Sequence, residues 1–213
     1  MKQLVIIGAR GFGREIYNSA CESIGYGTEF TIKGFLDDKK DALDGYEGYP
    51  PILDTVEDYN PQPDDAFVCA LGSVSYKKKY ISIVEGKGGR FINLVHEETS
   101  FFKNVKLGNG NVFCKGVLVS CDTKIGSYNT FNDFVSIGHD SLIGDFNSFM
   151  TAARISGNTV VGNENYFGVN SSVIEKIKIG NNTVLAAGSV LMRRTKDGYT
   201  YIGIPASALV IKK

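Results

Sequence analysis

The sequence has no excess of charge of either sign and no long apolar run. Lys and Arg number 23 among the 213 residues, and Asp and Glu also number 23, so no strong field would attract a nucleic acid or an anionic membrane. No apolar run approaches the roughly 20 residues that a membrane-spanning helix needs. Residues 1–7 run into a predicted strand rather than a signal peptide. We therefore expect no nucleic-acid partner, no membrane insertion and a cytoplasmic location.

Cysteine and histidine are scarce. The four cysteines show no C-x-x-C spacing and no disulfide framework, so reduced thiols are expected. The two histidines, His96 and His139, are too few for a zinc site built from three histidines, and Cys121 is a poor substitute for the missing ones. No G-x-S-x-G segment is present, which argues against a Ser-His-Asp hydrolase. We expect no metal.

A six-residue repeat dominates the second half of the chain. Every sixth residue from Leu107 to Leu191 is large and apolar, without a break in register. Neither the period of a helix nor that of a simple strand explains this spacing. A hexapeptide repeat is typical of a parallel β-helix, in which short strands form the faces of a triangular coil. Three hexapeptides make one coil of 18 residues, so the repeat predicts about five coils over residues 105–194.

Small residues accompany the apolar positions of the repeat. We expect the glycines that directly follow many of them to supply the φ > 0 that a corner needs: Gly108, Gly126, Gly138, Gly144, Gly162, Gly168 and Gly180. Two positions before each apolar residue stands a small, polar or β-branched residue, which we expect to pack where the interior narrows.

The first part of the chain alternates predicted strands and helices. An apolar run over residues 2–7 leads into the glycine-rich turn at residues 8–13 and a helix start, the arrangement of a phosphate-binding βα unit. Its spacing, G-x-x-G-x-G, differs from the dinucleotide motif, so a tight turn without a ligand stays an equal alternative. A second strand, Phe30–Leu36, ends at Asp37 and Asp38, which are placed to accept hydrogen bonds from a nucleotide or to cap a turn.

The rest of this region supplies further elements. Residues 39–65 are rich in glycine and proline and are predicted to be mostly loops. Residues 66–71 and 91–95 read as the third and fourth strands. A helix is predicted over residues 75–86, with Lys77, Lys78 and Lys79 on a solvated face and Tyr76, Tyr80, Ile83 and Val84 on the opposite side. The alternation predicts a small Rossmann-like α/β domain with a parallel sheet.

His139 is the one histidine inside the repeat. It stands two positions after the inward Ile137 and should face outward at a corner. Gly157 lies one coil further, about 4.8 Å away by strand spacing. A side-chain base would thus sit beside an unobstructed backbone N–H, and the adjacent Asp140 could orient the ring. A solvent-exposed histidine without a function is the alternative.

Taken together, these motifs resemble a family of bacterial sugar O- and N-acetyltransferases. The family includes sialic acid O-acetyltransferases and enzymes that acetylate UDP-4-amino-sugars. The resemblance covers nearly the whole chain, and residues 137–146 are its most specific segment. It implies a left-handed parallel β-helix over residues 99–195, an α/β sugar-nucleotide-binding domain over residues 1–98 and a C-terminal closing segment over residues 196–213.

The same resemblance implies a homotrimer with acetyl-CoA between neighbouring β-helices and a role in cell-surface polysaccharide biosynthesis. His139 would be the general base, Asp140 its acidic neighbour, and the N–H of Gly157 would face the thioester oxygen. Further contacts to acetyl-CoA are implied for Ser148, Val169 and Ala187. The sugar nucleotide would be bound by Gly8, Gly11, Phe12, Gly13, Asp37, Asp38, Gly72 and Asn132. Phe12 and Ser148 replace histidines that some members of the family carry.

Three functions are consistent with these features. We favour acetyl transfer to an amino group of a UDP- or GDP-linked 4-amino-deoxyhexose. The alternatives are O-acetylation of a sialic acid-like sugar and a non-catalytic trimer that only binds a sugar nucleotide.

Overall fold

A computed structural model describes residues 1–209, and the chain divides into two compact units. The first spans Met1–Glu97 and the second begins at Glu98. Among residues 1–209, no helix combines the length and the apolar character needed to cross a membrane.

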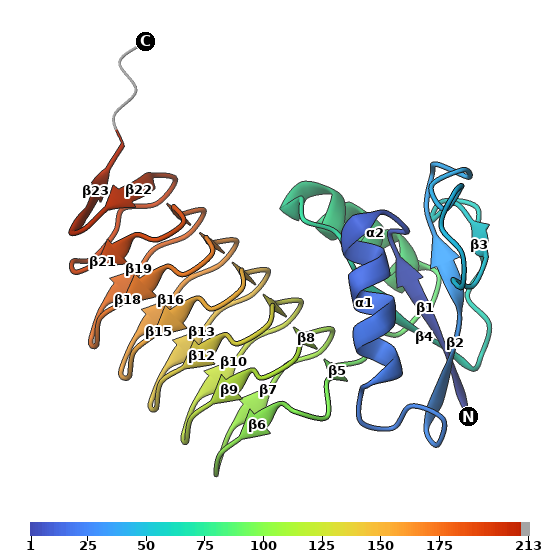
Figure 1. Ribbon diagram of the computed structural model, residues 1–213, viewed down its shortest axis with the longest axis horizontal. Helices are drawn as coiled ribbons and strands as arrows, with labels where there is room; N and C mark the ends of the chain where they lie inside the picture. Colours follow the sequence, from blue (N-terminus) through green and yellow to red (C-terminus); the bar gives the residue numbers. More distant parts are fainter. Residues whose placement is uncertain (210–213) are drawn as a thin grey trace. The chain divides into compact units, whose positions relative to one another are not determined.

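The first unit contains a parallel sheet and two helices (Figure 1). Its strands, in the order β3-β2-β1-β4, are β1 (Lys2–Ile7), β2 (Phe30–Leu36), β3 (Ile52–Asp54) and β4 (Asp65–Cys69). Helix α1 (Gly11–Cys21) follows β1, and helix α2 (Val74–Gly86) follows β4. The last four residues of β1 and all of β4 are buried, which is why these strands read as continuous apolar runs.

The fourth strand of this sheet differs from the prediction. Of residues 91–95, only Leu94–Val95 form a strand, β5, while Phe91 makes an isolated bridge to Phe67. The fourth strand is instead β3, which lies inside the segment predicted to be mostly loops. An edge strand of three residues flanked by proline and glycine is too short to show a period of its own.

Helix α2 corrects the interpretation of its lysines. Lys78 and Lys79 are exposed, but Lys77 is only 2% exposed because it shares the buried side of the helix with Tyr80, Ile81 and Val84. This burial lowers the pKa of Lys77. Tyr76, expected on the apolar side, is 58% exposed.

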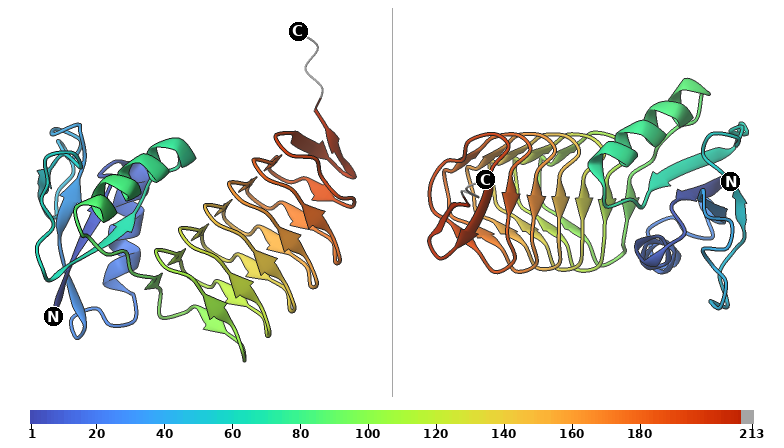
Figure 2. Two further views of the ribbon diagram at one scale, coloured as in Figure 1. Left: turned by 180° about the vertical axis from the view of Figure 1, so that it is seen from behind. Right: turned by 90° about the horizontal axis from the view of Figure 1, so that it is seen from above.

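The second unit is a parallel β-helix whose coils stack through two-residue strands (Figures 1 and 2). The first face carries β6 (Ser100–Phe101), β9 (Leu118–Val119), β12 (Ser136–Ile137), β15 (Arg154–Ile155), β18 (Ser172–Val173) and β21 (Val190–Leu191). The second face carries β7 (Lys106–Leu107), β10 (Lys124–Ile125), β13 (Leu142–Ile143), β16 (Val160–Val161) and β19 (Lys178–Ile179). The third face carries β8 (Val112–Phe113), β11 (Thr130–Phe131), β14 (Ser148–Phe149), β17 (Tyr166–Phe167) and β20 (Val184–Leu185). A small parallel-sheet domain followed by a parallel β-helix, as predicted, is therefore confirmed.

Side chains stack in columns inside the β-helix, and two of these columns are built from a single residue type. Phe113, Phe131, Phe149 and Phe167 stack face to face, with successive ring centroids 4.7, 4.8 and 4.6 Å apart. At one corner, the buried amides of Asn111, Asn129, Asn147 and Asn165 form a hydrogen-bonded ladder in which the side-chain oxygen of each of the first three accepts from the next asparagine, 18 residues along. Every residue of the ladder thus satisfies a polar group of its neighbour, as burial requires.

The glycines of the repeat have a different role from the one predicted. Positive φ occurs not directly after the inward residue but three positions after it, mostly at non-glycine residues such as Asp122, Asp140 and Asn158. A Cβ on Gly144 would lie 2.6 Å from the carbonyl oxygen of Gly162 in the next coil. These glycines are therefore required by the close approach of successive coils, not by φ.

The C-terminal segment continues the third face. Strand β22 (Thr200–Gly203) pairs in parallel with β20, and β23 (Ala206–Ala208) returns antiparallel to β22. Residues 210–213 of the predicted closing segment lie outside the described residues.

Candidate functional site

Two corners of the β-helix hold most of the residues predicted for acetyl transfer. We call the turn after the first face the His139 corner (residues 138–141 and 156–159). The turn after the third face is the Val169 corner (residues 132–135, 168–171 and 186–189). Each corner repeats once per coil because the strands pair with a register of 18 residues.

His139 and Asp140 form a hydrogen-bonded pair at the His139 corner. The Nδ1 atom of His139 lies 2.7 Å from Oδ2 of Asp140, and both side chains are about half exposed. Asp140 has φ 56°, a left-handed conformation that the short, polar Asp side chain tolerates. Because an ionised carboxylate only accepts hydrogen bonds, it assigns the proton to Nδ1 and leaves Nε2 with its lone pair. The corner thus presents a base to solvent.

Gly157 lies directly against the histidine ring. A Cβ on Gly157 would be 2.7 Å from Nε2 of His139, and a Cβ on Gly138 would be 2.4 Å from the nitrogen of Gly157. The backbone holds this contact in register, since the N–H of Asn158 donates to the carbonyl of His139 at 2.8 Å. Two glycines are therefore needed for the imidazole to lie beside the backbone of the next coil.

The N–H of Gly157 donates to no acceptor among residues 1–209. The equivalent backbone N–H groups in the turn after the second face do have acceptors, supplied by a side chain of the next coil. The N–H of Ser127 donates to the carboxylate of Asp145 at 2.7 Å, and the N–H of Asp145 donates to the side-chain oxygen of Asn163 at 2.8 Å. At the His139 corner a donor is left available beside a base, as an oxyanion site requires.

The remaining residues predicted to contact acetyl-CoA lie elsewhere on the chain. Val169 is 44% exposed and Ala187 is also exposed, and both lie on the Val169 corner. Asn132 shares that corner, and its buried Oδ1 has no hydrogen-bond partner among the described residues. Ser148 lies on the third face and is buried. Within one chain, the first face separates these residues from His139 and Gly157.

The first unit contains a cavity of about 380 Å³ at the carboxyl ends of its strands. Of the residues predicted to bind substrate, Gly8, Phe12, Gly13, Asp37, Asp38 and Gly72 line it, whereas Gly11 does not. The cavity is also lined by Arg10, which belongs to the predicted glycine-rich turn, and by Ser73, Tyr76 and Tyr80, which were not among the predicted substrate-binding residues. The four-residue spacing of Tyr76 and Tyr80 on a helix that begins just after the third strand was the available signal.

The two acidic residues after β2 have different environments. Asp37 is 8% exposed, and its two carboxylate oxygens accept hydrogen bonds from the backbone N–H groups of Ala9 and Lys39, each at 2.9 Å. Asp37 therefore holds the glycine-rich turn in place. Asp38 is exposed at the cavity and accepts a hydrogen bond from the hydroxyl of Tyr80.

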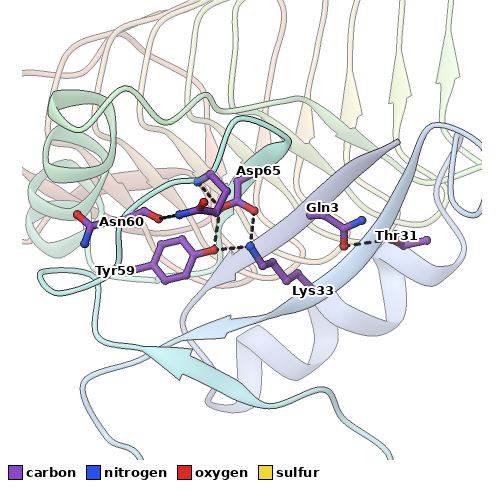
Figure 3. A network of polar contacts seen from close by, with 7 residues as sticks. Gln3, Thr31, Lys33, Tyr59, Asn60 and Asp65 are labelled. Carbon is purple, nitrogen blue, oxygen red and sulfur yellow. Dashed lines mark hydrogen bonds and ion pairs between the residues drawn. The ribbon is translucent and has the colours of Figure 1, made fainter.

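A polar network fixes the segment between β3 and β4 (Figure 3). This segment contributes Val56 to the cavity. Lys33 Nζ donates to the hydroxyl of Tyr59 and to Oδ1 of Asp65, each at 2.8 Å, and Tyr59 donates to Oδ2 of Asp65 at 2.7 Å. Burial disfavours the charged form of Asp65, but the hydrogen bonds from Lys33, the Gln62 N–H and Tyr59 outweigh it and lower its pKa. The segment that carries Val56 is therefore anchored by the ion pair between Lys33 on β2 and Asp65 on β4.

Metal binding finds no support in the part of the chain that the structure describes. No group of three or more His, Cys, Asp or Glu side chains there is arranged to hold an ion.

The comparisons with known proteins agree with this architecture. Residues 3–84 match the family described as the PglD N-terminal domain. The chain is similar to PerB from Caulobacter crescentus in complex with CoA and GDP-perosamine, with 25% identity, a TM-score of 0.87 and coverage of 99% of this chain and 98% of that one. A variant of perosamine N-acetyltransferase from the same organism, also with CoA and GDP-perosamine, has 23% identity, a TM-score of 0.87 and the same coverage.

A third similar structure is the acetyltransferase domain of PglB from Neisseria gonorrhoeae FA1090 in complex with acetyl coenzyme A. It has 25% identity, a TM-score of 0.88 and coverage of 98% of this chain and 99% of that one. No curated protein sequence matches the chain significantly. The predicted resemblance to β-helix sugar acetyltransferases is thus confirmed.

Proposed function

We propose that this protein transfers an acetyl group from acetyl-CoA to the amino group of a 4-amino-deoxyhexose linked to a nucleoside diphosphate. The observation that carries the proposal is the contact at the His139 corner, where Nε2 of His139 lies against Gly157 and Nδ1 is held by Asp140. A base, its orienting carboxylate and a free backbone donor are the groups that direct attack on a thioester needs.

The reaction proceeds by addition and elimination at the thioester carbonyl. The sugar amine attacks the carbonyl carbon while Nε2 of His139 accepts a proton from the nitrogen. The N–H of Gly157 donates to the oxyanion of the tetrahedral intermediate. The C–S bond then breaks, and the thiolate of CoA leaves and takes the proton from His139. The products are the N-acetyl sugar and CoA, and Asp140 holds the imidazole in one tautomer throughout.

The donor would lie between two subunits of a homotrimer. Two features support this arrangement. The Val169 corner is separated from His139 within one chain, and the β-helix exposes apolar side chains on its faces, including Leu118, Leu142 and Val160 at 36%, 45% and 38%. In a trimer, the Val169 corner of one subunit would face the His139 corner of another. Light scattering should give three times the mass of 23.2 kDa.

The acceptor is supported by the cavity of the first unit and by the relatives. PerB binds GDP-perosamine and the gonococcal domain binds acetyl coenzyme A, so both substrate classes occur among proteins of this architecture. A protonated sugar amine must lose a proton to react, which suits a nearby histidine. A cytoplasmic location and a role in cell-surface polysaccharide biosynthesis remain predictions.

The test is a CoA-release assay with acetyl-CoA and a panel of UDP- and GDP-linked amino sugars. His139→Ala should reduce kcat/KM by about 10² to 10⁴, the range of general acid–base catalysis. Ser156→Ala, an exposed residue of the same corner, is the matched control. Near-wild-type turnover by His139→Ala would reject the mechanism, and acetylation of hydroxyl acceptors alone would favour the sialic acid-like alternative.

A further inference from the structure

The turn after the second face shows how this β-helix satisfies one class of backbone N–H. The N–H of the residue two positions after the inward side chain donates to a side-chain oxygen of the residue 18 positions further along. Four such bonds, between 2.7 and 3.1 Å long, run from Asn109 to Ser127, from Ser127 to Asp145, from Asp145 to Asn163 and from Asn163 to Asn181. Serine, aspartate and asparagine all act as acceptors, so the contact tolerates different side-chain lengths.

The His139 corner has a similar backbone arrangement. The hydroxyl of Thr123 donates to the carbonyl of Gly138, 15 residues later, at 3.1 Å. In the turn after the second face, the side-chain amide of Asn129 donates to the carbonyl of Gly144, also 15 residues later, at 2.9 Å. Gly138 and Gly144 both directly follow an inward isoleucine, so the two turns are equivalent in register. The turn after the second face is therefore a guide to the contacts open to the His139 corner.

Glu175 stands at the position from which the N–H of Gly157 would be capped. Gly157 comes two positions after the inward Ile155, and Glu175 follows 18 positions later. The N–H of Lys176 donates to the carbonyl of Gly157 at 3.0 Å, which holds the backbone of Glu175 one coil beyond Gly157. Glutamate is one methylene longer than the aspartate that accepts from Ser127, so its carboxylate has the length to reach the N–H.

In the structure, the carboxylate of Glu175 lies in an outward position. Its side chain is 67% exposed, and Oε1 lies 3.6 Å from Nζ of Lys176, whose side chain is 71% exposed. An ion pair between exposed side chains contributes little to stability. A hydrogen bond from a backbone N–H to a carboxylate is stronger. The outward position is therefore easily exchanged for one that caps Gly157.

We propose that Glu175 competes with acetyl-CoA for the N–H of Gly157. Its carboxylate accepts this N–H while the donor site is empty, and the thioester carbonyl oxygen takes its place when acetyl-CoA binds. The carboxylate then occupies the outward position beside Lys176. A carboxylate left next to Gly157 would oppose the negative charge that develops on the thioester oxygen, so it must leave before the reaction. This autoinhibitory contact rests on the proposed function, because it acts on the oxyanion donor of that reaction.

Two CoA derivatives separate a capping role from a general charge effect. S-ethyl-CoA, a thioether, has no carbonyl oxygen and need not displace Glu175, whereas acetyl-CoA must. Titration calorimetry of the full-length protein should show that Glu175→Ala binds acetyl-CoA about twofold to tenfold more tightly than the wild type, the range of one net hydrogen bond. The affinity for S-ethyl-CoA should stay unchanged. An equal gain for both ligands, or no gain for acetyl-CoA, would overturn the proposal.

Glu175→Gln is the matched control. Its amide oxygen can still cap Gly157, as asparagine does in the turn after the second face, but it carries no charge. The affinity of this variant for acetyl-CoA should therefore lie nearer to that of the wild type than to that of Glu175→Ala. Equal affinities in the glutamine and alanine variants would show that charge alone matters and would reject the cap.

The amide proton of Gly157 gives a readout that needs no ligand. In the ligand-free, isotope-labelled protein, its NMR signal should move upfield in Glu175→Ala, because a hydrogen bond to a carboxylate is lost. The signal of Asp145, in the turn after the second face, should stay in place and show that the fold is intact. A Gly157 signal that does not move would contradict the proposal.

The two proposals fail in different ways. A response of acetyl-CoA affinity and of the Gly157 signal to Glu175→Ala, without CoA release from any amino sugar nucleotide, would reject the acetyl transfer and leave the competition standing. CoA release by the wild type, with both quantities unchanged in Glu175→Ala, would reject the competition and leave the acetyl transfer standing.

Discussion

The Nε2 atom of His139 lies 2.7 Å from the position that a Cβ on Gly157 would occupy. The two residues are 18 positions apart and belong to successive coils. The base is therefore packed against the backbone whose N–H would stabilise the oxyanion, and a change at one residue must affect the other.

Gly157→Ala should reduce activity far more than stability. The added methyl group meets the end of an exposed side chain, which can rotate away, so the fold should tolerate it. The displaced imidazole would no longer sit beside the N–H of residue 157, and kcat should fall by about 10² to 10³, as when an oxyanion donor is lost. Steady-state kinetics and thermal unfolding measured on the same samples check this. A parallel loss of Tm and kcat would indicate a structural role instead.

Asp140→Asn should impair catalysis while keeping the corner intact, because Asn also tolerates a positive φ. An amide that donates to Nδ1 would favour the tautomer with the proton on Nε2, which cannot act as a base. We expect kcat to fall by about 10² or more, up to the 10⁴ known for the serine-protease triad. Asp122→Asn is the control, since Asp122 has φ 57° at the equivalent position one coil earlier. Equal effects of the two substitutions would contradict the orienting role of Asp140.

Asn147→Ala should destabilise the β-helix. Its side chain accepts from the amide and the backbone N–H of Asn165, each at 2.9 Å, and donates to the carbonyl of Gly162 at 2.9 Å. Each buried partner left unsatisfied costs about 1–3 kcal/mol, so the free energy of unfolding should fall by about 3 kcal/mol or more. Urea denaturation measures the loss. Ser172→Ala, at an outward position of the first face, should stay within about 0.5 kcal/mol of the wild type.

The Lys33–Asp65 pair should make part of the stability of the first unit depend on acidity. The pKa of Asp65 is lowered in the folded state, so its contribution is present above the unfolded pKa of about 3.9 and is lost as the pH falls through the folded pKa. Asp65→Asn should cost about 1–3 kcal/mol at pH 7. The difference between variant and wild type should shrink towards pH 2. Unfolding free energies across this range test the sign, and a difference that does not change with pH would contradict it.

The repeat could be predicted from the sequence because each inward position requires a large apolar side chain, and such a side chain recurs at every sixth residue. Ile137 and Ile155 pair across successive coils at the predicted spacing, and this register places Gly157 beside His139. The strand Phe30–Leu36 is also found with its predicted bounds, and its last three residues are buried.

Other features depend on tertiary contacts that no local pattern encodes. The burial of Lys77 follows from which side of α2 packs on the sheet, and three adjacent lysines do not reveal it. The pairing of Asp38 with Tyr80 joins residues 42 positions apart, across two strands and a loop. The prediction for the repeat glycines was wrong. The pattern shows where a side chain is missing, but it does not show whether glycine is needed for a positive φ or for the close approach of the next coil.

The register of 18 residues has a consequence for how this chain can change. Outward positions of the first face vary freely, as Ser136, Arg154 and Ser172 show, because a substitution there alters one side chain. Adding or removing a single residue between His139 and Gly157 would instead turn every later inward side chain outward. It would also move Gly157 away from the imidazole of His139. Selection on this half of the molecule should therefore tolerate substitutions and eliminate insertions and deletions, except those that add or remove a whole coil outside the site.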